Sequence, residues 1–380
     1  MALLFIVTVL LYLAIIGGFI IGFDKVAELN LKDLPAKTKF SVVIPFRNEA
    51  AHLDSLLKSI FKLNYPKHLF EVVLVNDASE DASINIINER VSKHNDNTTA
   101  PINIKVIDAV RNTNAPKKDA ITTAIKTITN TWIVTTDADC IVPQNWLNAM
   151  DVFIQYKSPN CIVAPVTYRY TGTFLNRFQI LDMYSLQGTT IGAFGLRLPF
   201  LCNGANFAYK KSVFETVNGF DGNTNIASGD DVFLLEKIVK EYPHTAHYLK
   251  CKNAIVSTQS LPSWSALISQ RIRWAAKTKG YSHWFGKFTG IIVFLTNLFT
   301  LLLLLLVAFG GFNHKIWVYG VIIKLHLDFL LLYKTSAFFS QRQAFKSYLS
   351  SFLLYPFFCT YVAALSMFKG YSWKGRNFKM

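Results

Sequence analysis

Three long uncharged stretches constrain the fold of this chain more than any other feature. Residues 2–23, 290–312 and 348–368 contain no Asp, Glu, Lys or Arg. Since a helix needs about 20 apolar residues to cross the hydrocarbon core of a bilayer, each stretch predicts a membrane span. The first stretch could instead be a cleaved signal peptide, but it lacks a clear basic n-region and a small-residue cleavage site. We therefore expect a retained N-terminal anchor.

The stretch 316–332 is a weaker candidate for a span. Lys324, His326 and Asp328 interrupt it, and ionisable groups are costly in hydrocarbon unless they face protein or water. We expect this segment to lie in the membrane interface or to re-enter. With two C-terminal spans instead of three, the basic tail 369–380 stays on the cytoplasmic side, which Lys and Arg favour.

The charge of the chain is strongly basic. Its 39 Lys and Arg against 24 Asp and Glu give a formal charge of +15, which suits either nucleic acid or an anionic membrane surface. The apolar stretches favour the membrane, so we expect no nucleic-acid partner. Lys277, Lys279 and Lys287 lie just before residue 290, and the positive-inside rule then places the middle of the chain in the cytoplasm. The five cysteines show no metal-ligand spacing and are expected to be reduced thiols.

The middle region alternates short β-rich runs with helical pieces. Unbroken apolar runs predict buried parallel strands, and the alternation predicts βαβ units. We therefore expect a Rossmann-like α/β fold, a mostly parallel sheet with helices on both faces, whose ligands bind beyond the carboxyl ends of the strands. The expected strands are 40–46, 70–76, 102–107 and 131–137, and the first helices are 49–62 and 81–93.

Acidic residues follow two of these strands. Asp77 ends the second strand, where with Ser79 it could simply form a turn and cap the next helix. Asp137 and Asp139 follow the fourth strand, and side chains two apart on extended backbone point the same way. Two carboxylates with diphosphate oxygens are typical ligands of a hard divalent ion such as Mg²⁺ or Mn²⁺.

Two later motifs offer further chemistry. Asp230 and Asp231 could supply a carboxylate base for an acceptor hydroxyl, or they could cap the helix that follows them. Gln270, Arg273 and Trp274 could hold a diphosphate, because Arg binds phosphate in a bidentate manner and Trp offers a flat stacking surface. The same residues would also suit an amphipathic helix at the membrane surface.

The aromatic segment 174–200 contains few charges. Such stripes are usually core, but beside membrane spans we favour a membrane-surface segment that guides a lipid-borne acceptor.

Seven motifs together resemble the inverting family 2 glycosyltransferases of the GT-A fold. They occur in the order that is characteristic of that family, and such an ordered set is far more specific than any one member. They are VVIPFRNE (42–49), VNDAS (75–79), APKKDAI (115–121), TTDADC (135–140), NGANFAYKKSVFE (203–215), GDDVFLL (229–235) and QRIRW (270–274).

The resemblance implies a site for a nucleotide-sugar donor. Asp77 would hydrogen-bond the nucleotide base, and Pro45 and Glu49 would shape the base pocket. Lys118, with Lys117 beside it, would lie near the base and the diphosphate; the choice between these two lysines stays open because the usual preceding glycine is missing.

The resemblance also implies the reacting end of the site. Asp137 would touch the ribose or the metal, and Asp139 would be a ligand of the divalent metal. Asp231 is the expected general base, with Asp230 beside it.

Two positions depart from the family pattern VDDGS, because Asn76 replaces the first acid and Ala78 replaces the glycine. We expect both changes to be tolerated, since Asp77 is the position that contacts the base.

We expect an inverting glycosyltransferase that moves a sugar from a nucleotide sugar, with a bias toward UDP, to a membrane lipid or lipid-linked acceptor. The alternatives are a processive polysaccharide synthase, a nucleotidyltransferase and a non-catalytic membrane scaffold. The expected organisation is a transmembrane anchor (1–23), a GT-A domain on the cytoplasmic face of the cell membrane (38–288), a C-terminal transmembrane region (290–368) and a basic tail (369–380).

Overall fold

The computed structural model describes residues 1–368 and 370–378 of the 380-residue chain and divides into two compact units. The sheet unit comprises Ala27–Thr167 and Cys202–Gln259. The helical unit comprises Met1–Val26, Tyr168–Leu201 and Ser260–Met380. Each unit is therefore assembled from segments that are far apart in the sequence.

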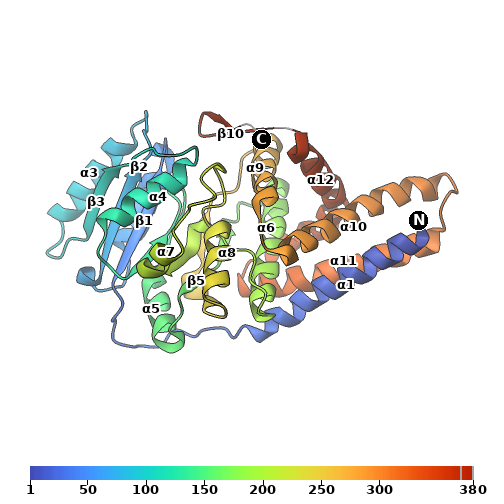
Figure 1. Ribbon diagram of the computed structural model, residues 1–380, viewed down its shortest axis with the longest axis horizontal. Coiled ribbons are helices and arrows are strands. Elements are labelled where there is room, and N and C mark those ends of the chain that lie inside the picture. Colours follow the sequence, from blue (N-terminus) through green and yellow to red (C-terminus); the bar gives the residue numbers. More distant parts are fainter. Residues whose placement is uncertain (369, 379–380) are drawn as a thin grey trace. The chain divides into compact units, whose positions relative to one another are not determined.

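A seven-stranded mixed sheet forms the centre of the sheet unit (Figure 1). Its spatial order is β3-β2-β1-β4-β7-β5-β8, and the first four strands in this order are mutually parallel. β7 runs antiparallel to both of its neighbours, whereas β5 and β8 pair in parallel. The strands are β1 (Phe40–Phe46), β2 (Phe70–Asn76), β3 (Asn103–Asp108), β4 (Trp132–Thr135), β5 (Cys161–Val163), β7 (Phe207–Lys210) and β8 (Ala246–Tyr248).

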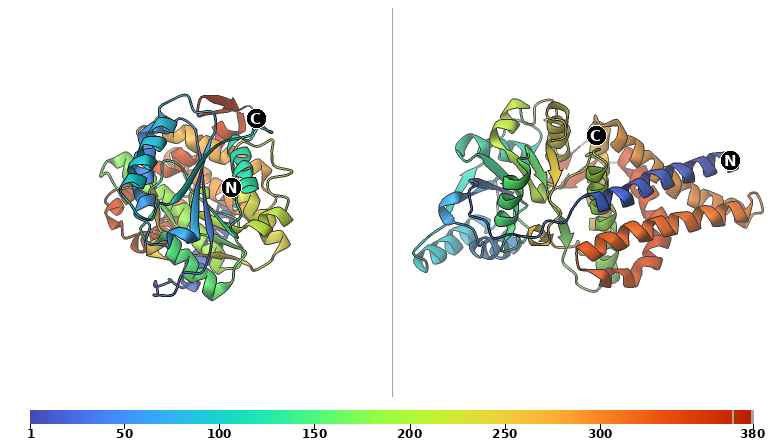
Figure 2. Two further views of the ribbon diagram at one scale, coloured as in Figure 1. Left: turned by 90° about the vertical axis from the view of Figure 1, so that its left-hand side faces the viewer. Right: turned by 90° about the horizontal axis from the view of Figure 1, so that it is seen from below.

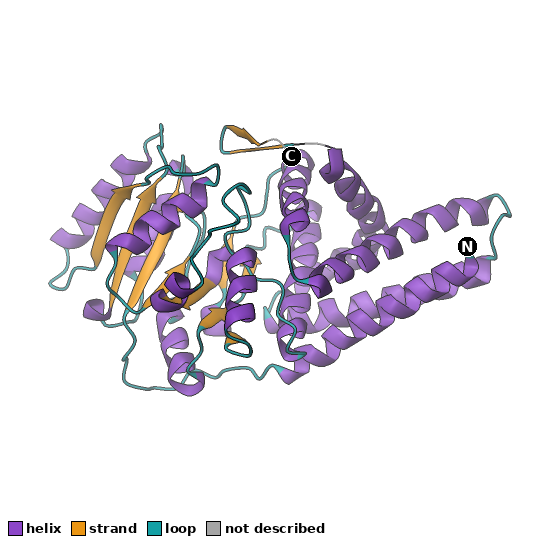
Figure 3. Cartoon of the chain, viewed as in Figure 1, coloured by secondary structure: helices purple, strands orange, loops and turns teal. Residues whose placement is uncertain are grey.

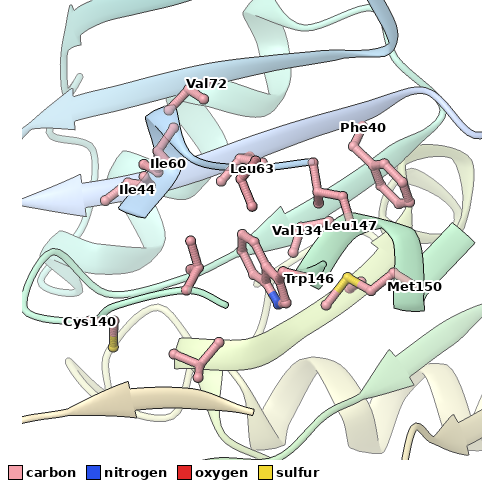
Figure 4. Packing of buried hydrophobic residues seen from close by; sticks show 14 of the residues in the cluster. Phe40, Ile44, Ile60, Leu63, Val72, Val134, Cys140, Trp146, Leu147 and Met150 are labelled. Carbon is pink, nitrogen blue, oxygen red and sulfur yellow. The ribbon is translucent and has the colours of Figure 1, made fainter. Parts of the chain in front are cut away.

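Helices cover both faces of this sheet, which confirms the predicted α/β class (Figure 3). α2 (Ala50–Phe61), α3 (Ser83–Asp96) and α5 (Trp146–Lys157) contribute to one hydrophobic core, in which Trp146 is fully buried (Figure 4). α4 (Pro116–Thr127) contacts β1 and β2 and contributes no residue to that core. Smaller elements complete the unit: η1 (Lys67–Leu69), η2 (Gly204–Asn206), α7 (Lys211–Thr216), α8 (Val232–Glu241), η3 (Lys252–Ala254) and the strand pair β6 (Val166–Tyr168) and β9 (Val256–Thr258).

The observed strands agree with the predicted ones, with two differences. β4 (Trp132–Thr135) is shorter than the predicted strand 131–137, so Asp137 lies in the loop that follows the strand. The strand 103–108 is not buried, because β3 is the edge of the sheet and all of its residues keep some exposure. The predicted strands 40–46 and 70–76 coincide with β1 and β2.

Long helices build the helical unit. α1, α10 and α11 contact one another, and the right-hand view of Figure 2 shows their long axes. The helices are α1 (Ala2–Lys25), α6 (Phe174–Gly195), α9 (Trp264–Ala276), α10 (Trp284–Ala308), α11 (His314–Phe338) and α12 (Tyr348–Phe368), with η4 (Lys277–Gly280), η5 (Arg342–Ser347) and a hairpin of β10 (Tyr371–Trp373) and β11 (Arg376–Phe378).

Glycines bring α1 and α6 into very close contact. A Cβ atom at Gly195 would lie 1.8 Å from the carbonyl oxygen of Gly22, and one at Gly192 would lie 2.4 Å from that of Phe19. Only glycine permits backbones to approach this closely. Most residues of α6 are buried, so its packing is that of a core helix and does not support the expected membrane-surface role of residues 174–200.

Four helices are long and apolar enough to cross a membrane, judged by length and composition. They are Ala2–Lys25, Trp284–Ala308, His314–Phe338 and Arg342–Phe368, with mean hydropathies of 2.8, 2.8, 1.6 and 1.6. Two of them contain the predicted spans 2–23 and 348–368, and Trp284–Ala308 covers the predicted span 290–312 only up to Ala308. His314–Phe338 contains the segment 316–332, which we had expected to be the weakest.

The charges that interrupt α11 are paired within the helical unit. The Lys324 ammonium lies 2.6 Å from an Asp328 carboxylate oxygen and 4.6 Å from the centre of the Phe352 ring. The Tyr12 hydroxyl of α1 donates a hydrogen bond to Asp328. Because buried charges are tolerated in an apolar setting when they are paired, these groups leave α11 able to cross a bilayer.

Candidate active site

The loops after β1 and β2 are held together by Arg47. Its guanidinium donates to the carbonyl oxygens of Asp77 (2.8 Å) and Ala78 (2.6 Å) and to the carboxylate of Glu80 (3.0 Å). Ala78 has a φ of 54°, in the left-handed region that favours glycine. The glycine of the pattern VDDGS suits this conformation, whereas the alanine of this chain adopts it with backbone strain.

Asn76, the other departure from the family pattern, faces an acid on the neighbouring strand. Its side-chain amide donates to the Asp108 carboxylate (2.8 Å), and its amide oxygen accepts from the Ser79 N–H (2.9 Å). An aspartate at position 76 would face Asp108 as a like charge. The neutral amide therefore fits its surroundings on β3.

Asp77 is buried at the carboxyl end of β2, and a basic residue after β3 contacts it. Arg111 donates to the Asp77 carboxylate and lies 3.7 Å from an Asp119 oxygen on α4. Asp77 is thereby connected to the first turn of α4. Of the two residues expected to shape the base pocket, Pro45 lies near the end of β1 and Glu49 is buried, 2.8 Å from the His52 ring nitrogen Nδ1.

The loop after β4 gathers possible metal ligands. The ligand atoms of Asp137, Asp139 and Cys140 all lie within 4.8 Å of one another. Burial, reinforced by the two carboxylates, raises the pKa of the Cys140 thiol well above its usual value, so the sulfur stays protonated. Two partly exposed carboxylates are hard oxygen ligands, and this donor set fits Mg²⁺ or Mn²⁺.

Lys117 connects these acids to the GDD motif. Its ammonium lies 2.7 Å from an Asp137 oxygen and 3.1 Å from an Asp230 oxygen. Burial alone would lower the pKa of Lys117, but the carboxylates of Asp137 and Asp230 raise it above its usual value, and the ammonium stays charged. Lys117 and Asp119 share the first turn of α4, so this turn contacts both the Asp77 side and the Asp137 side of the rim.

Lys118 points elsewhere. Its buried ammonium donates to the carbonyl oxygens of Asn223 (2.7 Å) and Ile226 (2.9 Å). Lys237 of α8 donates to the carbonyls of Gly219 (2.8 Å) and Asp221 (2.7 Å) in the same loop. The two lysines hold the loop that leads into Asp230 and Asp231, and of the two neighbouring lysines it is Lys117 whose ammonium reaches the acids.

Both carboxylate oxygens of Asp231 are engaged by backbone N–H groups. Oδ1 accepts from Val232 (2.7 Å) as the N-cap of α8, and Oδ2 accepts from Gly204 (3.0 Å). The Thr135 hydroxyl at the end of β4 donates to the Gly204 carbonyl oxygen (2.8 Å). The turn at Gly204 thus positions Asp231 relative to the sheet.

Asp230 is the more buried of the two acids in contact with Lys117. Burial raises its pKa; Lys117 opposes this rise, and Asp231 and Asp137 add to it. A Cβ atom at Gly204 would lie 2.9 Å from the Asp230 carboxylate and 3.2 Å from the Lys117 ammonium. Glycine at this position leaves room for the acid and the ammonium to meet.

Gln270, Arg273 and Trp274 lie on α9 in the helical unit. The Gln270 amide oxygen accepts from the Tyr168 hydroxyl (3.4 Å) and from Arg271. Arg271 is buried against Asp182 (2.6 Å), and its guanidinium lies 4.2 Å from the centre of the Trp274 ring. Within this motif Arg271 is a packing residue, whereas Arg273 is partly exposed.

Two residues of the site escaped the sequence analysis. Arg111 follows the third strand, so its place at a carboxyl strand end was a usable signal for a contact with Asp77. Gly204 lies inside the motif NGANFAYKKSVFE (203–215), but only the atoms around it show that a side chain has no room there.

Family comparisons agree with this geometry. Residues 41–217 match the family described as "Glycosyl transferase family 2", and residues 132–367 match "Glycosyl transferase family group 2". The second match spans more than half of the chain and includes Asp137, Asp139, Asp230, Asp231 and the α9 motif.

Individual relatives are more distant. A probable glycosyltransferase, YdaM of Bacillus subtilis, is 28% identical over 255 residues, which are 65% of this chain and 56% of the relative. The poly(ribitol-phosphate) beta-N-acetylglucosaminyltransferase TarS of Staphylococcus aureus is 30% identical over 116 residues, 30% of this chain and 19% of the relative. The matched regions thus span about half or less of these relatives.

A solved structure shares the fold along nearly the whole chain. The mannosyltransferase PcManGT of Pyrobaculum calidifontis, in complex with GDP-Man and Mn²⁺, superposes with a TM-score of 0.57 at 16% identity, covering 96% of this chain and 99% of that one. At this identity the likeness concerns the fold alone, and it agrees with the predicted GT-A architecture. With the acids gathered at the strand ends and the family match across residues 132–367, the chain belongs to glycosyl transferase family group 2 and is a glycosyltransferase of the GT-A fold.

Proposed function

We propose that this enzyme transfers one sugar, with inversion, from a nucleotide-sugar donor to a membrane lipid or lipid-linked acceptor, and that a UDP-sugar is its preferred donor. The observation that carries the proposal is the meeting of acids from separate segments around the first turn of α4. Lys117 lies between Asp137 and Asp230, and Arg111 lies between Asp77 and Asp119.

The donor end of the proposed site uses groups at the ends of β1, β2 and β4. Asp77 would accept a hydrogen bond from the nucleotide base, within a pocket bounded by Pro45 and Glu49. Asp139 with Asp137 would hold Mg²⁺ or Mn²⁺, which would neutralise the charge that develops on the departing diphosphate. Lys118 is better suited to hold the loop before Asp230 than to bind the donor, because backbone carbonyls engage its ammonium.

The acceptor end would use Asp231 as the general base. Inversion at an anomeric carbon needs a group that takes the proton from the attacking hydroxyl. The backbone N–H groups of Val232 and Gly204 orient the Asp231 carboxylate, and an ionised carboxylate can accept several hydrogen bonds, including one from an acceptor hydroxyl. Asp230 would support this role through its contact with Lys117.

The resemblance assigns the α9 motif to the same reaction: Arg273 would bind a diphosphate and Trp274 would offer it a flat stacking surface. The Gln270 amide oxygen accepts a hydrogen bond from the Tyr168 hydroxyl. The four apolar helices support an integral membrane protein, which is consistent with a lipid acceptor. The basic residues before α10 favour a cytoplasmic active site.

The mechanism is tested with two substitutions and a control. We expect Asp231→Asn to abolish transfer while the donor still binds, and Asp139→Ala to lose the metal-dependent part of donor affinity. Calorimetry with a UDP-sugar and Mn²⁺ measures binding, and released nucleoside diphosphate measures turnover. Asp33→Asn, a change at an exposed acid, is the matched control and should leave both unchanged. Wild-type turnover in Asp231→Asn would remove Asp231 as the base.

The products test the type of transfer. Incubation of the purified protein with a UDP-sugar and a membrane lipid extract should give a lipid carrying a single added sugar. A long polymer among the products would instead place the protein with the processive polysaccharide synthases.

A further inference from the structure

One ammonium group lies between the acid proposed for metal binding and the acid beside the proposed base. The Lys117 side chain is 16% exposed, and the Asp230 side chain that it contacts is 11% exposed. Asp137, on its other side, is 39% exposed and faces solvent. The inner contact is therefore sheltered from water, whereas the outer contact is open to a competing ion.

The neighbouring lysine does not share this position. Lys118 donates to the carbonyls of Asn223 and Ile226, and its ammonium lies 4.7 Å from the centre of the Phe233 ring. Exchange of roles between the two lysines would break these contacts. Gly204 leaves the space in which Lys117 and Asp230 meet.

Asp137 has two possible cationic partners. Its carboxylate belongs to the group with Asp139 and Cys140 that could hold a metal ion, and one of its oxygens is 2.7 Å from the Lys117 ammonium. A divalent ion and an ammonium that contact the same carboxylate repel each other strongly over such distances. Binding of the ion therefore favours a position of Lys117 away from Asp137.

We propose that Lys117 is a positioning residue that serves as a movable counter-ion: it neutralises Asp137 until a divalent cation binds there, and it then contacts Asp230 alone. This inference rests on the proposed function, because it assigns the cation to Asp137 and Asp139. It couples the two ends of the site, since cation binding at the donor end sets the position of the charge beside Asp230 at the acceptor end.

Mn²⁺ binding without any nucleotide tests the competition. Titration of the full-length protein, with free Mn²⁺ followed by electron paramagnetic resonance, should show about tenfold tighter binding in Lys117→Met, because the competing ammonium is gone. Lys117→Arg keeps the charge and should bind Mn²⁺ as the wild type does. Lys126→Met removes a charge from the exposed end of the same helix and should also match the wild type.

A double-mutant cycle ties the effect to Asp137. In an Asp137→Asn background, Lys117→Met should change the Mn²⁺ affinity by less than twofold, since the carboxylate for which the two cations compete is absent. An equal gain in both backgrounds would overturn the proposal, as would unchanged or weaker Mn²⁺ binding in Lys117→Met. Tighter binding in Lys117→Arg would overturn it as well.

The Mn²⁺ binding experiment and the test of the proposed sugar transfer can fail independently of each other. Failure of Mn²⁺ to bind the wild type and every variant would overturn the counter-ion role, whereas the glycosyl transfer itself is judged by donor turnover in the wild type and in Asp231→Asn. If the competition holds, Lys117→Met should also lower kcat although it binds Mn²⁺ more tightly. A loss of packing alone would not produce these opposite changes.

Discussion

A single added methyl group at Gly204 should disable the site while leaving the fold intact. In Gly204→Ala the new Cβ atom would lie 2.9 Å from an Asp230 carboxylate oxygen, 3.2 Å from the Lys117 ammonium and 3.5 Å from the Asp231 Cβ atom. Ordinary contacts between carbon atoms begin at ~3.5 Å, so the Asp230 carboxylate or the Gly204 turn has to move by roughly 0.5 Å. Both acids and the ammonium would be displaced together.

The expected cost follows from this displacement. A misplacement of about 1 Å at a reacting centre costs on the order of a hundredfold in rate, so a shift of about half that size should lower kcat by roughly tenfold or more. Donor affinity should stay within about twofold. At the base end Arg111 pairs with Asp77, whereas the Gly204 N–H pairs with Asp231, so the displacement concerns the other end of the site.

The assay is steady-state release of nucleoside diphosphate, together with calorimetric donor binding. Gly17→Ala is the matched control, because a Cβ atom at Gly17 would meet no atom within 4 Å, and its activity should equal that of the wild type. Wild-type kcat in Gly204→Ala would refute the reasoning, because it would show that displacing the acids does not impair transfer.

Three further changes test the rim of the sheet. Ala78→Gly should raise the free energy of unfolding by about 0.5–1 kcal/mol in denaturant titrations, because it relieves a left-handed φ of 54°; a lower value would show that the strain is absent. Asn76→Asp should lower the same quantity by about 1 kcal/mol, since a carboxylate would face Asp108, and an unchanged value would contradict this pairing. Burial raises the pKa of Asp230, and protonation of Asp230 would weaken the contact with Lys117 through which it supports the proposed base Asp231. Loss of this support should give kcat/KM an acid limb above the ordinary carboxyl range near about pH 4, and Lys117→Met should move the pKa of Asp230 still higher by removing the charge that opposes the rise; a limb that moves to lower pH would contradict the assignment.

The sequence predicted the first half of the sheet unit well because hydrophobic periodicity determines buried parallel strands directly. β1 and β2 match their predicted bounds. The exposed edge position of β3 depends on strand order, which periodicity does not report. The antiparallel strand β7 follows an inserted segment, 168–201, that belongs to the other unit. The low charge of residues 174–200 indicated a segment near the membrane, but it did not reveal that α6 packs as a buried helix against α1.

For the candidate site, the sequence predicted the acidic residues but not the contacts that they make. The motifs predicted which acids follow which strands, because strand ends are visible in a sequence. Lys117 contacts carboxylates and Lys118 contacts backbone carbonyls because their side chains point in different directions from the first turn of α4. The sequence shows only two adjacent lysines, so it could not reveal this difference. The charges of α11 were expected to weaken a span, whereas Lys324 and Asp328 pair with each other, a contact that composition alone does not predict.

The glycine contact between α1 and α6 affects how this enzyme has to be produced. Trimming residues 1–26 to remove one of the four apolar helices would uncover the bare backbone around Gly192 and Gly195 on α6. The chain continues from this helix to the turn at Gly204, so unravelling of the helix would loosen the segment that leads into the candidate site. Shortened versions of the protein should therefore aggregate or lose turnover, and activity should be sought with the first helix in place.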